Sequence, residues 1–235
     1  MAARRVRDIE YQLLRSGKRR TADIIIERDG HISVRAPAHL SEEQADAVVE
    51  SRRFWIYRNL AEWQDLNVTR LVREWVNGEG FLYLGSSYRL LLVQDQDDPV
   101  KLRDGRFCLL RKIVEKGGEE AARHAFESFY WAKGLERIRH RVAYFSPKVG
   151  VSPQSIEVKD IGYRWAVCTS EGRLSFHWKC MMAPPKVIDY IIVHELCHLH
   201  CRDHTDVFWN EVDKVMPDYY ERKAWLRQKG ASLDL

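Results

Sequence analysis

The sequence lacks the features that would place the chain in or across a membrane. None of its 235 residues belongs to an apolar run approaching the roughly 18 residues that a membrane helix needs. The opening residues 1–8 contain no apolar segment of the kind that a secretory signal peptide has. These absences predict a cytoplasmic protein with no membrane partner. A 45% share of hydrophobic residues beside 31% charged residues indicates a globular chain with a sizeable core.

Cysteine is scarce, and its number is odd. Because no secretory signal accompanies them, the five cysteines are expected to be reduced thiols rather than a disulfide framework. They are Cys108, Cys168, Cys180, Cys197 and Cys201. A large excess of either charge is also lacking. The net charge of +4 therefore gives only weak support to nucleic-acid binding.

Positive charge is nevertheless concentrated near the N-terminus. Basic residues outnumber Asp8 and Glu10 in this segment, which favours a solvated terminus and leaves a phosphate-binding patch as the alternative. These basic residues are Arg4, Arg5, Arg7, Arg15, Lys18, Arg19 and Arg20.

The first part of the chain has the pattern of strands with one helix. Apolar residues 24–26 and 32–34 flank Asp29 and Gly30, which predicts a hairpin. Ser41 and Gln44 then have the spacing of a capping box, so a helix should follow. The buried stripe predicted for this helix consists of Val48, Val49, Phe54, Trp55 and Leu60.

Further strands are predicted before the periodicity changes to that of helices. The pattern predicts one pair at residues 81–84 and 88–93, and a second pair around Asp104 and Gly105. A helix is predicted from about residue 119 to 145, closed by Pro147 and Gly150. Two short strands follow, the second at 174–178, and the rest is helical. The core residues expected on the long helix are Ala122, Phe126, Tyr130, Ile138, Val142 and Tyr144.

A predicted helix after Pro184 and Pro185 carries a pattern typical of a metal site. Residues advance about 100° each along a helix, so His194 and His198 lie on one face, one turn apart. Catalytic zinc usually takes three protein ligands and one water, whose pKa falls towards neutrality. In the H-E-x-x-H arrangement, the glutamate that follows the first histidine receives the proton of that water, which makes Glu195 the candidate base.

The alternative for this five-residue pattern is an amphipathic helix with two hydrogen-bonded histidines. The apolar residues 191–193 argue against it, because they place the first histidine on a buried helix, where an unpaired ring is costly.

Two residues compete as the third ligand. His204 follows His198 at the spacing of H-E-x-x-H-x-x-G-x-x-H enzymes, although Cys201 replaces their helix-ending glycine. Cys201 is itself a candidate ligand if the helix continues, since it lies on the face of His198. His204 is favoured, because a thiolate would reduce the Lewis acidity that hydrolysis requires. Cys197 is expected to pack in the core.

These segments together resemble a known family, the YgjP-like predicted metal-dependent hydrolases, which are relatives of the SprT-like zincin metallopeptidases. The resemblance extends over most of the chain and includes the run Arg-Trp-Ala-Val-Cys at 164–168 and the strand 174–178. It continues through 183–190 into the H-E-x-x-H helix, and then through His204, the pair 208–209 and the run 216–219. Near the N-terminus, residues 19–21, 34–37 and 53–56 are also similar to the family.

The resemblance implies a zincin-like α+β fold with an N-terminal antiparallel sheet region and a helical C-terminal half that carries H-E-x-x-H. It implies zinc as the cofactor, His194, His198 and His204 as its ligands, and Glu195 as catalytic acid and base. Two portions are expected, a mainly β portion at 1–115 with one helix and a catalytic portion at 116–235, packed together as one compact unit.

Three functions fit this interpretation. The first is a zinc metallopeptidase acting on peptides or proteins. The strand 174–178 is a candidate edge for an extended peptide, with pairing inside the sheet as the alternative. The second is nucleotide pyrophosphohydrolysis at the same metal site, with Arg164, Arg173 or the N-terminal basic segment holding phosphates. The third is a nucleic-acid-binding module with structural zinc, which a site with only three protein ligands would disfavour.

Several residues outside the ligand set have open roles. Tyr219 or Tyr220 is a candidate to stabilise an oxyanion, with core packing as the alternative. Trp209 and Trp225 are expected to pack. Asp189, His177 and Asp206 are candidates to orient a ligand ring, and the sequence does not choose among them.

Overall fold

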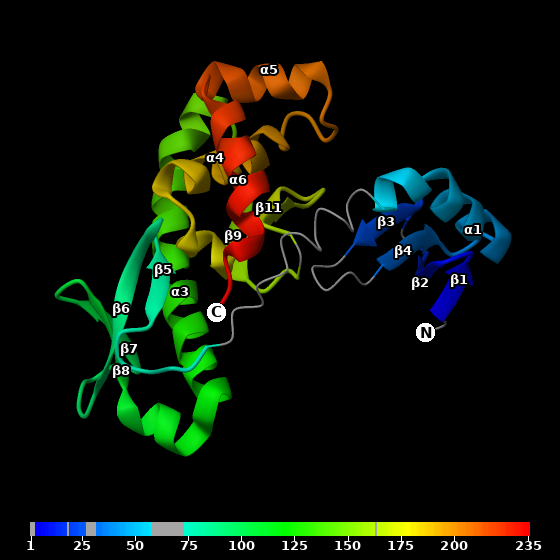
Figure 1. Cartoon of the computed structure of the whole chain (residues 1–235). Helices are drawn as coiled ribbons and strands as arrows, with labels where there is room; N and C mark the ends of the chain where they lie inside the picture. Colours follow the sequence, from blue (N-terminus) through cyan, green and yellow to red (C-terminus); the bar gives the residue numbers. More distant parts are fainter. Residues whose placement is uncertain (1–2, 18, 27–31, 58–72, 163) are drawn as a thin grey trace. The chain divides into compact units, whose positions relative to one another are not determined.

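The structure is a computed structural model that describes residues 3–17, 19–26, 32–57, 73–162 and 164–235 (Figure 1). The chain forms two compact units, Met1–Arg70 and Leu71–Leu235. The boundary expected near residue 115 falls inside the second unit, within the helix α3 (Arg111–Val149). The mixed α+β class and the helical C-terminal half are confirmed. Within the described residues, no helix combines the length and the apolar character needed to cross a membrane.

The first unit is a four-stranded sheet covered by a helix. Its strands are β1 (Ala3–Val6), β2 (Ile9–Ser16), β3 (Asp23–Ile26) and β4 (Ile32–Pro37), in the order β1-β2-β4-β3, with β2 and β4 parallel. The pairing of β3 with β4 confirms the predicted strands, whereas their turn at Asp29 and Gly30 lies outside the described residues. The sequence did not predict β1 and β2.

The helix α1 (Glu42–Ser51) begins with the predicted capping box, since Ser41 and Gln44 exchange both hydrogen bonds. Its predicted stripe is only partly correct. Val49 is buried, but Phe54 is 84% exposed and Trp55 is 42% exposed, and the buried residue of the following helical turns is Ile56. Residue 60 lies outside the described residues.

Part of the basic N-terminal segment is bound to acidic residues of α1. The guanidinium of Arg4 contacts Asp46 at 2.8 Å and also contacts Glu42. Arg7 lies 3.1 Å from Glu50. These ion pairs hold the β1–β2 hairpin on α1, so these arginines have a structural role.

The second unit opens with another four-stranded sheet. Its strands are β5 (Gly80–Tyr83), β6 (Ser86–Val93), β7 (Val100–Arg103) and β8 (Arg106–Leu110), which confirms the two predicted strand pairs. Aromatic rings join this sheet to α3. The ring centroids of Phe81 and Phe126 are 4.5 Å apart, and those of Phe107 and Phe126 are 5.0 Å apart.

The two four-stranded sheets have the same topology. The order β5-β6-β8-β7 repeats β1-β2-β4-β3, with a parallel pair in the middle and an antiparallel pair at each edge. In both sheets the second strand begins six residues after the first, and the third begins fourteen residues after the second. A helix follows the fourth strand in each case. The sequence shows no internal repeat, so this similarity is visible only in the backbone.

Helix α3 runs along the second unit, with the sheet β5–β8 beside its first half and the C-terminal helices around its end (Figure 1). Five of its six predicted core residues are buried, but Tyr144 is 48% exposed and Phe145 is buried in its place. The helix also continues through Pro147, and Gly150, with φ of 80°, caps it. Gly118 marks a kink, since its φ of 61° is not helical.

A three-stranded sheet follows, made of β9 (Ser155–Lys159), β10 (Ala166–Cys168) and β11 (Arg173–His177). The strand order is β10-β11-β9, so β11 is central and paired on both sides. Of the two alternatives for the strand at 174–178, the structure shows pairing inside the sheet and not an edge. Within the described residues, β10 is paired on one side only.

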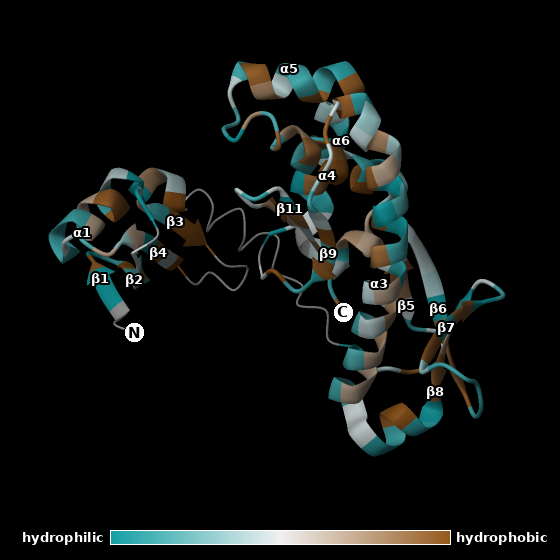
Figure 2. Ribbon diagram, turned by 180° about the vertical axis from the view of Figure 1, so that it is seen from behind, coloured by the Kyte–Doolittle hydropathy of each residue, from teal (hydrophilic) through white to brown (hydrophobic). Residues whose placement is uncertain are grey.

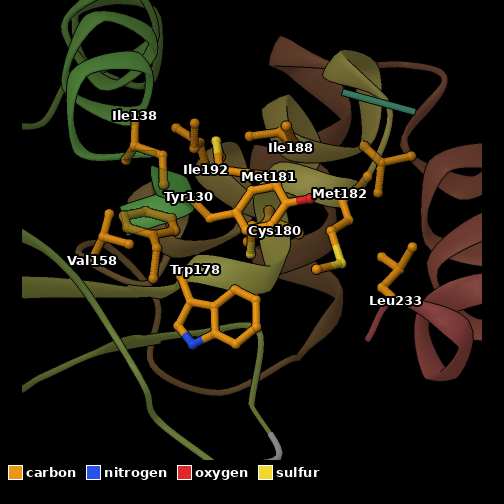
Figure 3. Close-up of a cluster of buried hydrophobic side chains, with 14 of the residues drawn as sticks. Tyr130, Ile138, Val158, Trp178, Cys180, Met181, Met182, Ile188, Ile192 and Leu233 are labelled. Atoms are coloured by element: carbon orange, nitrogen blue, oxygen red, sulfur yellow. The ribbon is translucent and has the colours of Figure 1, made fainter. Parts of the chain in front are cut away.

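The C-terminal elements enclose the core of the second unit. They are the 3-10 helix η1 (Trp178–Met182), α4 (Pro185–Cys197), α5 (Asp206–Val215), α6 (Tyr219–Lys229) and the 3-10 helix η2 (Gly230–Ser232). Hydrophobic and hydrophilic residues alternate along α5 (Figure 2), which buries Phe208 and Val212. In Figure 3, Tyr130 and Ile138 of α3 face Met181 of η1 and Ile192 of α4, so α4 rests on a continuous apolar core.

The tip of the β5–β6 hairpin supports the start of α4. Leu84 N–H donates to Met181 O at 2.8 Å, and Gly85 N–H donates to Met182 O at 3.1 Å. Gly85 has a φ of +81°, and a Cβ there would lie 2.9 Å from Pro184 Cα. Only glycine fits this turn without moving the first residues of α4.

We therefore expect Gly85→Ala to be more destabilising than Gly105→Ala, its matched control in the β7–β8 turn. Gly105 also has a positive φ, +71°, but no atom lies within 4 Å of the position that a methyl group would take there. Left-handed backbone alone should lower the free energy of unfolding by about 1–2 kcal/mol in either variant. Contact with Pro184 should add about 1–3 kcal/mol for Gly85→Ala. Urea unfolding midpoints measure the difference, and equal midpoints would contradict the supporting role of this contact.

Candidate metal centre

The H-E-x-x-H segment lies at the C-terminal end of α4. Proline at the first helical position starts the helix, and apolar residues bury most of its surface. The helix is also tied to α3, because Arg141 Nε and Nη2 donate to the carboxylate of Asp189 at 2.7 and 2.8 Å. This bidentate pair fixes the orientation of α4. Asp189, a candidate partner for a ligand ring, is thus engaged with Arg141 instead.

The three predicted ligands converge. The Nε2 atom of His194 lies 3.2 Å from Nε2 of His198 and 3.0 Å from Nε2 of His204. Nitrogen atoms around a tetrahedral zinc ion at Zn–N distances of about 2.0–2.1 Å are roughly 3.3 Å apart. The spacing of the rings therefore suits one small cation.

The hydrogen bond at Nδ1 of His198 leaves the lone pair of its Nε2 available to that cation. Its Nδ1 lies 3.1 Å from Cys201 O, and a carbonyl oxygen can only accept, so Nδ1 carries the proton. Nε2 of this neutral ring is then a bare acceptor that faces two other ring nitrogens. A bound cation satisfies this arrangement, because it accepts lone pairs from all three rings.

The rings are held in their neutral form. Burial lowers the pKa of His194 to about 3, and the charges of His198, His204 and Lys223 add to the shift. Burial likewise lowers the pKa of His198 and of His204. Only a neutral imidazole can bind a metal, so the site is prepared for ligation at neutral pH.

The turn between His198 and His204 lacks the glycine of the H-E-x-x-H-x-x-G-x-x-H pattern, which Cys201 replaces. Helix α4 ends at Cys197, and Cys201 N–H donates to Cys197 O at 3.0 Å. No residue between 198 and 204 has a positive φ, so this turn does not need glycine. Among the described residues, the group of side chains placed to hold a metal is His194, His198 and His204, and Cys201 is not part of it.

Glu195 is buried beside the edge strand β10. Only 6% of the residue is exposed. Burial raises the pKa of its carboxyl to about 8, while the positive charge of Arg164 and the backbone N–H of Cys168 lower it. A bound cation would also favour the carboxylate. The pKa of the Glu195 carboxyl is thus raised by burial and lowered by its neighbours, and a raised pKa suits a proton acceptor.

Aromatic rings surround the histidines. Phe208 lies 4.6 Å from His198 and 4.9 Å from His194, measured between ring centroids. Trp209 stacks on His204 at 5.7 Å and on Tyr219 at 5.4 Å. The sequence predicted packing for Trp209, and the structure adds that it packs against the candidate ligands.

The other candidate residues lie in different surroundings. His177 Nδ1 accepts from Lys179 N–H at 3.1 Å, and its Nε2 lies 3.5 Å from Asp160. Arg173 donates to Gln154 Oε1 at 3.3 Å. Tyr220 is 72% exposed, and Asp206 is an exposed residue in the first turn of α5.

The sequence prediction missed Lys223, whose Nζ lies 3.8 Å from the centroid of the Trp209 ring. Its spacing of four residues from Tyr219 places both side chains on one face of α6. This spacing is the one feature of the sequence that links Lys223 to Tyr219. The sequence does not show that this face of α6 packs against Trp209.

Three comparisons relate this chain to known proteins. No curated protein matches it significantly. Among solved structures, it is similar to the crystal structure of the metallopeptidase zymogen abylysin from Pyrococcus abyssi, with 21% identity and a TM-score of 0.37 over 39% of this chain and 93% of that one. A family model for the YgjP-like metallopeptidase domain matches residues 20–229. Because that match spans most of the sequence, the chain belongs to the YgjP-like metallopeptidase family.

Proposed function

We propose that the protein is a zinc metallopeptidase in which His194, His198 and His204 hold the ion and Glu195 is the general base. The observation that carries this proposal is the convergence of three Nε2 atoms one residue from a buried carboxyl group. Zinc, when bound, polarises a substrate carbonyl and acidifies a water molecule. Glu195 accepts the proton of the attacking water and passes it to the departing amine.

The strand β10 supports a peptide as the substrate. It pairs with β11 on one side, and its other side is unpaired among the described residues. An extended peptide can add to such an edge through backbone hydrogen bonds. Because the backbone N–H of Cys168 in β10 contacts Glu195, a peptide on this edge would run beside the base.

Removal of the metal tests this proposal. We expect an unstructured protein such as casein to be cleaved by the zinc-loaded chain, cleavage to stop after dialysis against a chelator, and one equivalent of zinc to restore it. The reason is that without the ion the substrate carbonyl loses its main source of polarisation and the water that Glu195 deprotonates is not acidified. Cleavage that continues at full rate in the metal-free protein would contradict a metallopeptidase mechanism.

Nucleotide pyrophosphohydrolysis is the second candidate, supported by the charge of Arg164 next to Glu195. An arginine there could hold a phosphate. Incubation with a panel of nucleoside triphosphates and zinc, magnesium or manganese, followed by a pyrophosphate assay, separates the two candidates. The convergence of three histidines rather than four ligands disfavours a purely structural zinc.

A further inference from the structure

Lys223 is placed by a stack of aromatic rings that ends on the candidate ligands. Helix α6 contributes Tyr219 and Lys223 from the same face. Tyr219 lies parallel to Trp209, with 16° between the ring planes. The ammonium of Lys223 sits on the Trp209 ring, and the same ring packs on His204 and His194. The indole therefore fixes the lysine relative to the histidines.

The ammonium of Lys223 has no acidic partner. Within the described part of the chain, no carboxylate lies within 4.0 Å of it, whereas the neighbouring Arg222 pairs with Asp218 at 2.7 Å. A cation–π contact holds the side chain but leaves its N–H donors available. Lys223 is also exposed, so a substrate can reach it.

Lys223 lies beside the candidate metal centre. Its Nζ is 3.8 Å from the centroid of the Trp209 ring, and that centroid is 5.7 Å from the His204 ring and 5.9 Å from the His194 ring. The ammonium and two of the candidate ligands therefore contact the same indole ring. Tyr220 is 72% exposed, and Tyr219 has its ring stacked against Trp209.

We propose that Lys223 is a catalytic residue that donates a hydrogen bond from Nζ to the carbonyl oxygen of the scissile peptide bond as that oxygen becomes negative. This inference rests on the proposed peptidase function and deepens it. Preorganised donors aimed at a developing oxyanion often provide the largest electrostatic contribution to acyl-transfer catalysis.

The reaction balances without a change in the charge of Lys223. As the water oxygen bonds to the carbonyl carbon, the π electron pair moves to the carbonyl oxygen and Glu195 takes a proton. The electron pair on that oxygen then re-forms the C=O double bond, the C–N bond breaks, and the departing amine receives the proton from Glu195. Lys223 keeps its own proton throughout and contributes only its charge and its hydrogen bond.

The test compares Lys223→Met and Lys223→Arg with Lys229→Met, a control at an exposed position near the end of the same helix. We expect Lys223→Met to lower kcat by about 10²–10³-fold, as the loss of an oxyanion donor does. KM and zinc content should stay within about twofold of the wild type, because the hydrogen bond forms in the transition state and not in the bound substrate. Lys223→Arg should keep part of the activity, and Lys229→Met all of it.

A binding measurement provides a readout that does not depend on turnover. A peptide of a cleaved sequence, with a phosphonamidate in place of the scissile amide, carries the negative charge of the transition state. Its affinity for the zinc-loaded protein, measured by calorimetry, should fall in Lys223→Met by about the same factor as kcat/KM.

The outcomes separate the two proposals. A raised KM with unchanged kcat would make Lys223 a substrate anchor and overturn its role at the oxyanion. Loss of zinc from Lys223→Met would likewise show a structural role. Equal cleavage by wild type and Lys223→Met would overturn this inference alone. A wild-type protein that binds zinc but cleaves no peptide would instead overturn the proposed function.

Discussion

Replacement of Glu195 by glutamine is expected to lower kcat for peptide cleavage by about 10²–10⁴-fold, the usual contribution of a general base. The two side chains have the same shape, so the buried site beside β10 should remain filled. Glutamine cannot accept the proton of the attacking water, however, and has none to return to the departing amine. Since Glu195 is not among the three histidines proposed to hold the ion, zinc content should not change.

The measurement is kcat and KM together with the zinc content of the same samples. Glu221→Gln is a suitable control, because Glu221 is an exposed residue in the first turn of α6. It should cleave at the wild-type rate. Undiminished cleavage by Glu195→Gln would remove this carboxyl group from the mechanism, whereas loss of zinc from Glu195→Gln would show that the carboxyl group helps to hold the metal.

The helix that carries two of the candidate ligands was predictable because its signals are local. The spacing of His194 and His198 determines that they share a helix face, and the apolar residues before them determine that the face is partly buried. The position of His204 required more than a helical rule, since the chain turns between 198 and 204. There the ligand spacing of H-E-x-x-H-x-x-G-x-x-H enzymes supplied the expectation, and the structure brings the three rings together.

Strand order could not be predicted in the same way. The run at 174–178 has the alternation of a strand, but whether it lies at an edge depends on β9 and β10, which come from elsewhere in the chain. The repeated sheet topology is a similar case, because strand spacing and pairing recur without a visible similarity in sequence. Periodicity reports which side of an element is apolar, and it does not report what packs against that side.

Errors on single helices have a more local cause. Residues advance about 100° each along a helix, so Phe54 and Trp55 lie about 140° and 240° from Val49 and were placed on the wrong stripe. Ile56 lies about 20° from Val49 on the same count, and it is the residue that is buried. On α3, Phe145 lies about 60° from the buried Val142 around the helix axis, whereas Tyr144 lies about 200° from it, so Phe145 and not Tyr144 belongs to the buried stripe. Lys223 was missed because a lysine on a C-terminal amphipathic helix normally faces solvent, and only the tertiary contact with Trp209 distinguishes it.

Exchange of the third candidate ligand should nearly abolish the stabilisation of the protein by zinc. We expect His204→Ala to weaken zinc binding by more than the 10–100-fold that is typical for loss of an outer partner, because a direct ligand disappears. At a free zinc concentration of about 100 times the wild-type Kd, the wild type gains about 2.7 kcal/mol of stability. A Kd raised about 100-fold reduces that gain to roughly 0.4 kcal/mol.

Cys201→Ser is the matched variant, since Cys201 is the rival ligand in the same turn. The contribution of Cys201 to the site is its backbone carbonyl, which accepts the hydrogen bond from His198 Nδ1 and is unchanged by the substitution. This variant should therefore keep both the zinc content and the zinc-dependent shift in melting temperature of the wild type. The reverse result, with zinc lost from Cys201→Ser and kept by His204→Ala, would assign the third ligand to the thiolate. The turn after α4 would then have to close differently, with the helix continuing past Cys197 so that Sγ of residue 201 replaces the ring of His204.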